Sequence, residues 1–158
     1  MKIQENFLNE NIFKNLQKII MSDDFPWYYQ NKVVDVNDDF FFSHILYMDD
    51  RQKSDLFYLC HPIIGKINFT KILRVKLNCY TRKENHIKHG WHTDQVNTPN
   101  AKVALFSFNT NNGYTLFKNN DKVVSKENTI IFFDNDQEHA SVSQTDKFLR
   151  INMNINYV

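Results

Sequence analysis

The chain has 158 residues, of which 42% are hydrophobic and 23% are charged. This length suits one domain with a sizeable core, and the composition excludes a disordered chain. The formal net charge of +1 does not direct the molecule towards nucleic acid, and no apolar run approaches membrane-spanning length. Cys60 and Cys79 lack metal-ligand spacing and no secretion signal is recognisable, so we expect reduced thiols in a cytoplasmic protein.

Helical periodicity dominates the first part of the chain. Apolar residues recur at three- and four-residue steps over residues 7–20, which predicts an amphipathic helix. A second helical stretch is expected within residues 54–69, with Pro62 near its start or at a break. Residues 40–47 are an apolar run that periodicity cannot assign. We therefore expect residues 1–70 to form a mainly helical support region.

Strand periodicity follows from Ile72 onwards. Apolar residues alternate over residues 72–80 with Arg74, Lys76, Asn78 and Tyr80, so these four share one face. The last segment alternates in the same way and places Arg150 on its polar face. Further strands, separated by turns rich in Asn and Asp, are expected at residues 101–109, 114–117, 122–125, 129–133 and 149–157.

Helices followed by many short strands predict an α+β, mainly β architecture. We expect an antiparallel sandwich or small barrel over residues 71–158, with the N-terminal helices packed on one sheet. The polar faces of the first and last strands would then look into the barrel or onto solvent. Alternation alone does not distinguish these two outcomes.

A possible metal site is formed by His92, Asp94 and His139. In a strand-like segment His92 and Asp94 point to the same face, and the later strands can return His139 to that place. Two imidazoles and one carboxylate can hold a divalent iron on one face and leave the opposite face open. The alternative is that His92 and Asp94 are loop residues with local hydrogen bonds.

Arg150 extends this hypothesis, because its planar guanidinium matches a carboxylate and could anchor a dicarboxylic acid. Tyr80 or Asn78 could donate a further hydrogen bond from the opening strand. The combination favours an oxygenase. The competing interpretations of Arg150 are a surface charge or a salt bridge to a residue such as Asp134.

The remaining histidines offer a second possible cluster. His86 and His89 are spaced by three residues from each other and from the motif, so a helix would place them on one face. Gly90 argues against a long helix there, and we expect both to be exposed loop residues or substrate contacts. His44 and His61 stand in apolar surroundings and are expected to be structural.

Six short segments carry a resemblance to a known family. They are Gly90-Trp91-His92-Thr93-Asp94, Phe106-Ser107-Phe108-Asn109, Gly113-Tyr114-Thr115-Leu116-Phe117, Phe132-Phe133-Asp134, His139-Ala140-Ser141 and Arg150-Ile151-Asn152. Their order resembles that in the 2-oxoglutarate/Fe(II)-dependent dioxygenases, and most of all the small prolyl-4-hydroxylase-like members of bacteria and phages. The resemblance covers about residues 73–157.

The resemblance implies a double-stranded β-helix, or jelly roll, with N-terminal support helices. It implies Fe(II), the cosubstrate 2-oxoglutarate and O2, with His92, Asp94 and His139 as iron ligands and Arg150 on the distal carboxylate of 2-oxoglutarate. The substrate would be a protein side chain or a small molecule, hydroxylated with release of succinate and CO2.

The chain departs from the family pattern at several positions. Asn112-Gly113-Tyr114-Thr115 stands where the family often has Gly-Gly-Glu-Thr. Arg150 stands where several prolyl hydroxylases resembling this chain use Lys, which leans away from a strict prolyl hydroxylase. The DNA-alkylation-repair branch carries a second Arg where this chain has Asn156, which counts against that branch.

Two other functional classes stay open. A non-catalytic jelly-roll protein could use the same fold to bind a ligand or a partner. A zinc hydrolase could use the same three ligands to activate water. The hydrolase lacks an obvious general base and gives Arg150 no role.

Overall fold

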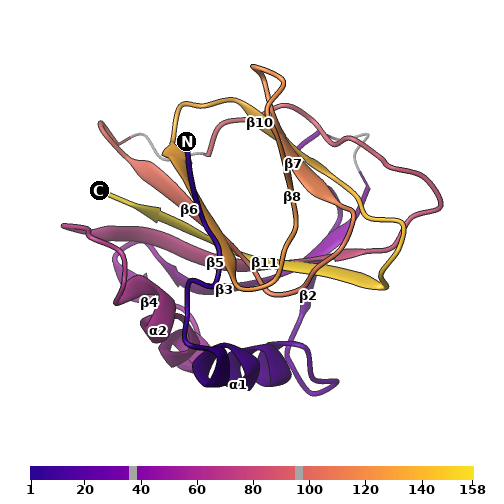
Figure 1. The fold of residues 1–158 in the computed structure, drawn as a ribbon. Helices are drawn as coiled ribbons and strands as arrows, with labels where there is room; N and C mark the ends of the chain where they lie inside the picture. Colours follow the sequence, from indigo (N-terminus) through magenta and orange to yellow (C-terminus); the bar gives the residue numbers. More distant parts are fainter. Residues whose placement is uncertain (36–38, 95–97) are drawn as a thin grey trace.

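Two antiparallel sheets face each other, and the helices lie outside the larger sheet (Figure 1). The computed structural model describes residues 1–35, 39–94 and 98–158. The helices are α1 (Glu10–Ile20), the 3-10 helix η1 (Asp55–Cys60) and α2 (His61–Ile64). The strands are β1 (Lys2–Gln4), β2 (Tyr28–Gln30), β3 (Phe41–Met48), β4 (Arg51–Gln52), β5 (Ile72–Thr81), β6 (Lys102–Ser107), β7 (Tyr114–Phe117), β8 (Lys122–Val124), β9 (Thr129–Asp134), β10 (His139–Val142) and β11 (Leu149–Tyr157).

The larger sheet has eight strands in the order β1-β9-β6-β11-β5-β3-β2, with β4 paired to β3, and the smaller has the order β10-β7-β8. The strands that are neighbours in space are mostly distant in sequence, as in a jelly roll. Isolated bridges join Lys88 to Val142 and His92 to His139, so the segment before residue 95 runs along β10. None of the helices in the described ranges is long and apolar enough to cross a membrane.

Helix α1 packs on the outer face of the larger sheet. Its start is capped by Asn9, whose side chain accepts a hydrogen bond of 3.0 Å from the backbone N–H of Asn11. Phe13 is fully buried and meets Phe106 of β6 edge-on, with 6.1 Å between ring centroids. The core of the molecule thus lies between the helices and this face of the sheet.

Alternation in β5 and β11 decides what each face of the larger sheet carries. Leu77 of β5 and Met153 of β11 are opposite each other in the antiparallel register and belong to the helix-side core. Asn78 and Asn152, one position away on each strand, therefore point to the other face, between the two sheets. The polar face of each strand looks into the barrel and not onto solvent.

The mainly β, jelly-roll architecture expected from the sequence is confirmed. The first seventy residues differ from the mainly helical region that we expected, because they also contribute β1 to β4. The unassigned apolar run forms β3, in which Phe41, Ser43, His44 and Leu46 are buried. Burial on both faces of this strand removes the alternation that identifies a half-exposed strand.

Candidate metal centre

His92, Asp94 and His139 lie together, with one possible ligand atom from each within 4.8 Å of the others. The two histidines are directly opposite in an antiparallel bridge, in which each backbone N–H donates to the other residue's carbonyl at 2.9–3.0 Å. Residues opposed in this way project their side chains to the same face. The imidazole centroids are 4.4 Å apart.

The surroundings of both imidazoles suit metal binding. Nδ1 of His92 lies 3.2 Å from the carbonyl oxygen of Gly90, and Nδ1 of His139 lies 3.0 Å from that of Gln137. A carbonyl accepts only from a protonated nitrogen, so we assign the proton to Nδ1 and the free lone pair to Nε2. Burial lowers the pKa of His92 and the nearby His139 lowers it further, which favours the neutral form that binds a metal.

Asp94 is held as an anion by three donors. Its oxygens accept from Arg74 Nη2 at 2.9 Å, from Asn156 Nδ2 at 3.0 Å and from Asn154 Nδ2 at 3.2 Å. Burial alone would raise the pKa of Asp94, but Arg74, His139 and the two asparagines together bring it below its ordinary value. The donors also fix the direction of the carboxylate, as partners behind a metal ligand do.

This donor set fits a divalent iron. Two imidazoles and one carboxylate, all buried or half-buried and lining one cavity, match the arrangement that non-heme Fe(II) oxygenases use. Such a set leaves coordination positions open towards the cavity for other ligands. The role of each residue as a ligand stays a prediction of the geometry.

Arg150 is buried in the same cavity. Its Nε donates to Ser125 Oγ at 2.8 Å, its Nη1 to Ser141 Oγ at 2.6 Å, and its Nη2 lies 3.4 Å from Thr115 Oγ1. The guanidinium also lies 5.4 Å from the centroid of the Tyr80 ring, on the opposite strand. Burial lowers the pKa of Arg150 below its ordinary value.

Within residues 1–35, 39–94 and 98–158, Arg150 has no carboxylate partner. The salt bridge to Asp134 considered from the sequence is not formed, because Asp134 pairs with Lys102 on the outside. A buried cation held only by hydroxyl groups is costly, unless an anion joins it. The guanidinium is therefore suited to receive a carboxylate from a ligand.

The cavity between the metal cluster and Arg150 has a volume of about 70 Å³. This is small beside the several hundred Å³ of most ligand pockets, so a ligand would enter only as the lining side chains move apart. The lining residues are Val33, Phe41, Lys76, Asn78, Tyr80, His92, Asp94, Leu105, Thr115, His139, Ser141, Arg150, Asn152 and Asn154.

The structure brings together every residue that the sequence proposed for the site. Tyr80 stacks on Phe41 at 5.5 Å and lines the cavity, and Asn78 donates to Asn152 Oδ1 at 2.9 Å. Sequence reasoning missed the hydroxyl partners of Arg150 and the three donors to Asp94. The signal for Asn154 and Asn156 was present, since both share the polar face of β11 with Arg150.

The other histidines do not join this cluster. His86 is exposed, as expected, whereas His89 is buried and stacks on Tyr80 with 5.9 Å between centroids. The expectation of an exposed His89 is wrong because the bridge beside Lys88 draws this segment onto β10. His61 is exposed rather than enclosed, and it contacts Phe57 edge-on.

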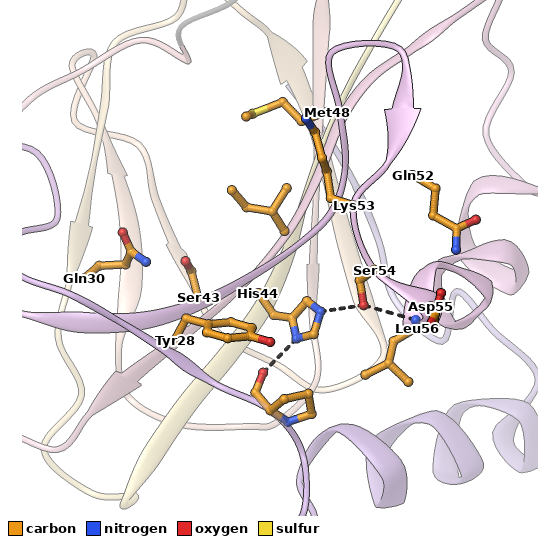
Figure 2. Close-up of a pocket in the computed structure, with 12 residues that line it drawn as sticks. Tyr28, Gln30, Ser43, His44, Met48, Gln52, Lys53, Ser54, Asp55 and Leu56 are labelled. Atoms are coloured by element: carbon orange, nitrogen blue, oxygen red, sulfur yellow. Dashed lines mark hydrogen bonds between the residues drawn. The ribbon is translucent and has the colours of Figure 1, made fainter.

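A larger cavity, about 830 Å³, lies elsewhere, beside β2, β3 and η1 (Figure 2). His44 joins its walls, with Nδ1 2.7 Å from the Pro26 carbonyl oxygen and Nε2 2.7 Å from Ser54 Oγ. Ser54 also accepts from the backbone N–H of Leu56 and so caps η1. These contacts give His44 the structural role that its apolar surroundings suggested, and among the described residues only the other cavity holds a metal-ligand cluster.

Comparison with known proteins agrees with the fold. No protein-family model matches the sequence, and no curated protein is significantly similar to it. Solved structures do match. An oxidoreductase of the 2OG-Fe(II) oxygenase family from Burkholderia pseudomallei aligns with a TM-score of 0.64 at 11% identity, covering 91% of this chain and 76% of that one. The chain resembles the 2OG-Fe(II) oxygenases.

Two further structures of this group extend the resemblance. A prolyl-4-hydroxylase from Pseudomonas putida aligns with a TM-score of 0.63 at 10% identity, covering 99% of this chain and 90% of that one. The non-heme alpha-ketoglutarate-dependent epimerase SnoN from nogalamycin biosynthesis aligns with a TM-score of 0.66 at 10% identity, covering 99% and 76%. At these identities the similarity to 2OG-Fe(II) oxygenases concerns the fold.

Proposed function

We propose that this protein is an Fe(II)- and 2-oxoglutarate-dependent oxygenase that hydroxylates a small molecule or a protein side chain. The observation that carries the proposal is one cavity lined by both the His92–Asp94–His139 cluster and a buried Arg150 with no carboxylate partner in the described chain. A metal site alone suits many reactions, and a buried arginine alone suits many ligands. Their combination within this fold suits a metal that works with a dicarboxylic acid.

The residues of the chain would divide the work between them. His92, Asp94 and His139 would hold the iron, and Arg74, Asn154 and Asn156 would keep Asp94 ionised and correctly directed. When bound, iron and 2-oxoglutarate would supply the redox chemistry, in which O2 oxidises a C–H bond of the substrate to C–OH while 2-oxoglutarate becomes succinate and CO2.

Arg150 would bind the distal carboxylate of 2-oxoglutarate through its guanidinium. Ser125 and Ser141 hold the guanidinium in place, and Tyr80 closes its other side. Phe41, stacked on Tyr80, would help to exclude water from this end of the cavity. The chain thus supplies orientation, charge and a dry environment.

A zinc hydrolase fits the cavity less well. Hydrolysis by a metal-bound water uses a general base within hydrogen-bond reach of that water. Of the described residues that line the cavity, Asp94 is the only carboxylate, and it is already committed to Arg74. This arrangement gives the buried Arg150 no function in hydrolysis.

Replacing His139 with alanine tests the metal site. We expect the His139→Ala variant to lose affinity for Mn(II), a redox-inert substitute for Fe(II), by at least about 100-fold, because one of three ligands is removed. Isothermal titration and the rise of the melting temperature with metal would measure the loss, since saturation at 100 times the Kd stabilises a protein by about 2.7 kcal/mol.

The matched control is His86→Ala, which removes an exposed imidazole outside the cluster. It should bind Mn(II) as the unmodified protein does. With iron, the unmodified protein should also convert 2-oxoglutarate slowly to succinate, and His139→Ala should not. Equal metal affinity in the two variants, or an unmodified protein that binds neither iron nor 2-oxoglutarate, would contradict the proposed function.

A further inference from the structure

Lys76 is a cationic residue of the candidate active site, and the proposed mechanism assigns it no role. It lies on the polar face of β5, opposite Asn154 of β11, and lines the same cavity as His92 and Asp94. Its neighbours on this face all have a role: Arg74 pairs with Asp94, and Tyr80 packs on Arg150. Asn154 donates to Asp94, whereas Arg150 is opposite Tyr80, so Lys76 stands beside the metal cluster rather than at the Arg150 end of the cavity.

The ammonium group of Lys76 has no anionic partner in the described parts of the chain. Its Nζ lies 5.4 Å from the centroid of the Phe41 ring. Burial and, to a smaller extent, the charge of Arg74 lower the pKa of Lys76 to about 8, although the charge of Asp94 opposes the change. Lys76 is half-buried, and an ammonium group that has lost part of its water beside an aromatic ring is stabilised by a counter-ion.

The charges around the cavity point to a missing anion. Arg74 is neutralised by Asp94, and Arg150 would be neutralised by one carboxylate of 2-oxoglutarate. The other carboxylate of the cosubstrate and a divalent metal together keep a net positive charge, so they do not neutralise Lys76. The positive charge of Lys76 remains when the cofactors of the proposed reaction are counted.

The surroundings of Lys76 are polar as well as charged. The side-chain oxygens of Asn78 and Asn154 are buried and accept no hydrogen bond from the described residues. Both residues line the cavity with Lys76. Buried acceptors of this kind are normally satisfied, so they suit hydrogen-bond donors on a part of the ligand other than its anionic group.

We propose that Lys76 binds a carboxylate or phosphate group of the substrate, so that the enzyme acts on an anionic molecule. This inference rests on the proposed function, because it assigns the substrate class of the same site. The anionic group would dock close to the metal cluster and thereby place a neighbouring C–H bond for oxidation. Lys76 is then a specificity-determining residue, distinct from Arg150, which serves the cosubstrate.

The test uses small anions as probes of the protein loaded with Mn(II) and saturated with 2-oxoglutarate. Trifluoroacetate and the neutral trifluoroacetamide, observed by fluorine NMR, form a matched pair that differs in charge. Methyl phosphate, observed by phosphorus NMR, distinguishes a phosphate site from a carboxylate site. Relaxation by bound Mn(II) reports whether each probe lies near the metal, without any need for turnover.

We expect Lys76→Met to weaken binding of at least one anionic probe by about tenfold or more, because a charge-assisted hydrogen bond is lost. Binding of trifluoroacetamide should not change, and Lys76→Arg should restore much of the anion affinity. Lys102→Met, which removes an exposed lysine of β6, is the matched control and should behave as the unmodified protein.

Each contrary result has its own meaning. Equal binding of both anions by Lys76→Met and the unmodified protein would overturn the role of Lys76, as would a loss confined to 2-oxoglutarate affinity. Loading with Mn(II) and 2-oxoglutarate is measured first, by titration, and its failure would overturn the proposed function. In that case the same probe titration on the metal-free protein decides whether Lys76 binds anions.

Discussion

Replacing Arg150 with methionine is expected to weaken 2-oxoglutarate binding by at least about 100-fold while leaving the metal-free protein folded. Two charge-assisted hydrogen bonds to a carboxylate would be lost, each contributing about 1.5–3 kcal/mol. The effect on folding should be small, because the guanidinium is buried without a carboxylate partner in the described chain. Methionine fills much of the same space without the cost of burying a charge.

The measurement is a pair of titrations. Isothermal titration of the Mn(II)-loaded protein with 2-oxoglutarate gives the loss of affinity, and urea unfolding of the metal-free protein gives the free energy of unfolding. We expect the latter to change by less than about 1 kcal/mol or to favour the variant, since the freed hydroxyls of Ser125 and Ser141 can reorient.

Arg82→Met is the matched control, because Arg82 is exposed and its guanidinium packs on the Phe148 ring outside the cavity. This variant should bind 2-oxoglutarate as the unmodified protein does. A loss of several kcal/mol of stability in Arg150→Met would instead show that the guanidinium is structural. Undiminished 2-oxoglutarate binding would remove Arg150 from the proposed site.

Replacing Asp94 with alanine is expected to destabilise the metal-free protein by about 3–5 kcal/mol, besides abolishing metal binding. Asp94 is 7% exposed and accepts from Arg74, Asn154 and Asn156. Its removal leaves a largely buried guanidinium and two amides without their acceptor. Removing one partner of a buried ion pair is strongly destabilising, because the remaining charge is uncompensated. His139→Ala, which breaks no ion pair, should cost less in the same measurement.

The effect should depend on pH in a defined direction. The pKa of Asp94 is lowered in the folded protein from its ordinary value of 3.8. The carboxylate therefore contributes fully to stability above about pH 4, and its contribution is lost as the pH falls through the lower, folded-state pKa. Urea unfolding at pH 7 should separate Asp94→Ala from the unmodified protein, and the difference should shrink in acid.

A double-mutant cycle isolates the ion pair. If Arg74 and Asp94 stabilise each other, Asp94→Ala should cost less when Arg74 is already methionine, with a coupling of about 0.5–3 kcal/mol. Additive effects of the two changes would contradict this pairing. Asp94→Asn, which keeps one acceptor oxygen, should be more stable than Asp94→Ala and still bind metal poorly.

Much of the fold could be predicted from the local alternation of apolar and polar residues. The strict alternation of β5 and β11 identified both strands and assigned Tyr80 and Arg150 to their polar faces. β3 could not be assigned in this way, because its buried residues lie on both faces. Its position beside β5 follows from pairing between distant segments, which a short window of sequence does not contain.

In the candidate site, too, some residues could be predicted from local sequence and others could not. The spacing of His92 and Asp94 was enough to predict both as ligands, since residues at i and i+2 share a face in an extended segment. Alternation placed Asn154 and Asn156 on a polar face, but nothing in the sequence paired them or Arg74 with Asp94. Arg74 comes from β5 and Asn156 from the far end of β11, and they meet Asp94 only because the two sheets close around the cavity.

By itself the sequence determined the strand periodicity, a set of ordered motifs that resemble those of the 2-oxoglutarate/Fe(II)-dependent dioxygenases, and a plausible set of metal ligands. Only the tertiary structure decided that the polar faces of β5 and β11 turn inward, that Arg150 is buried without a carboxylate partner in the described chain, and that Lys76 is left facing the metal cluster. The physical reason is that alternation is a property of one strand. Burial and the pairing of charges depend on which strands the closed barrel brings together.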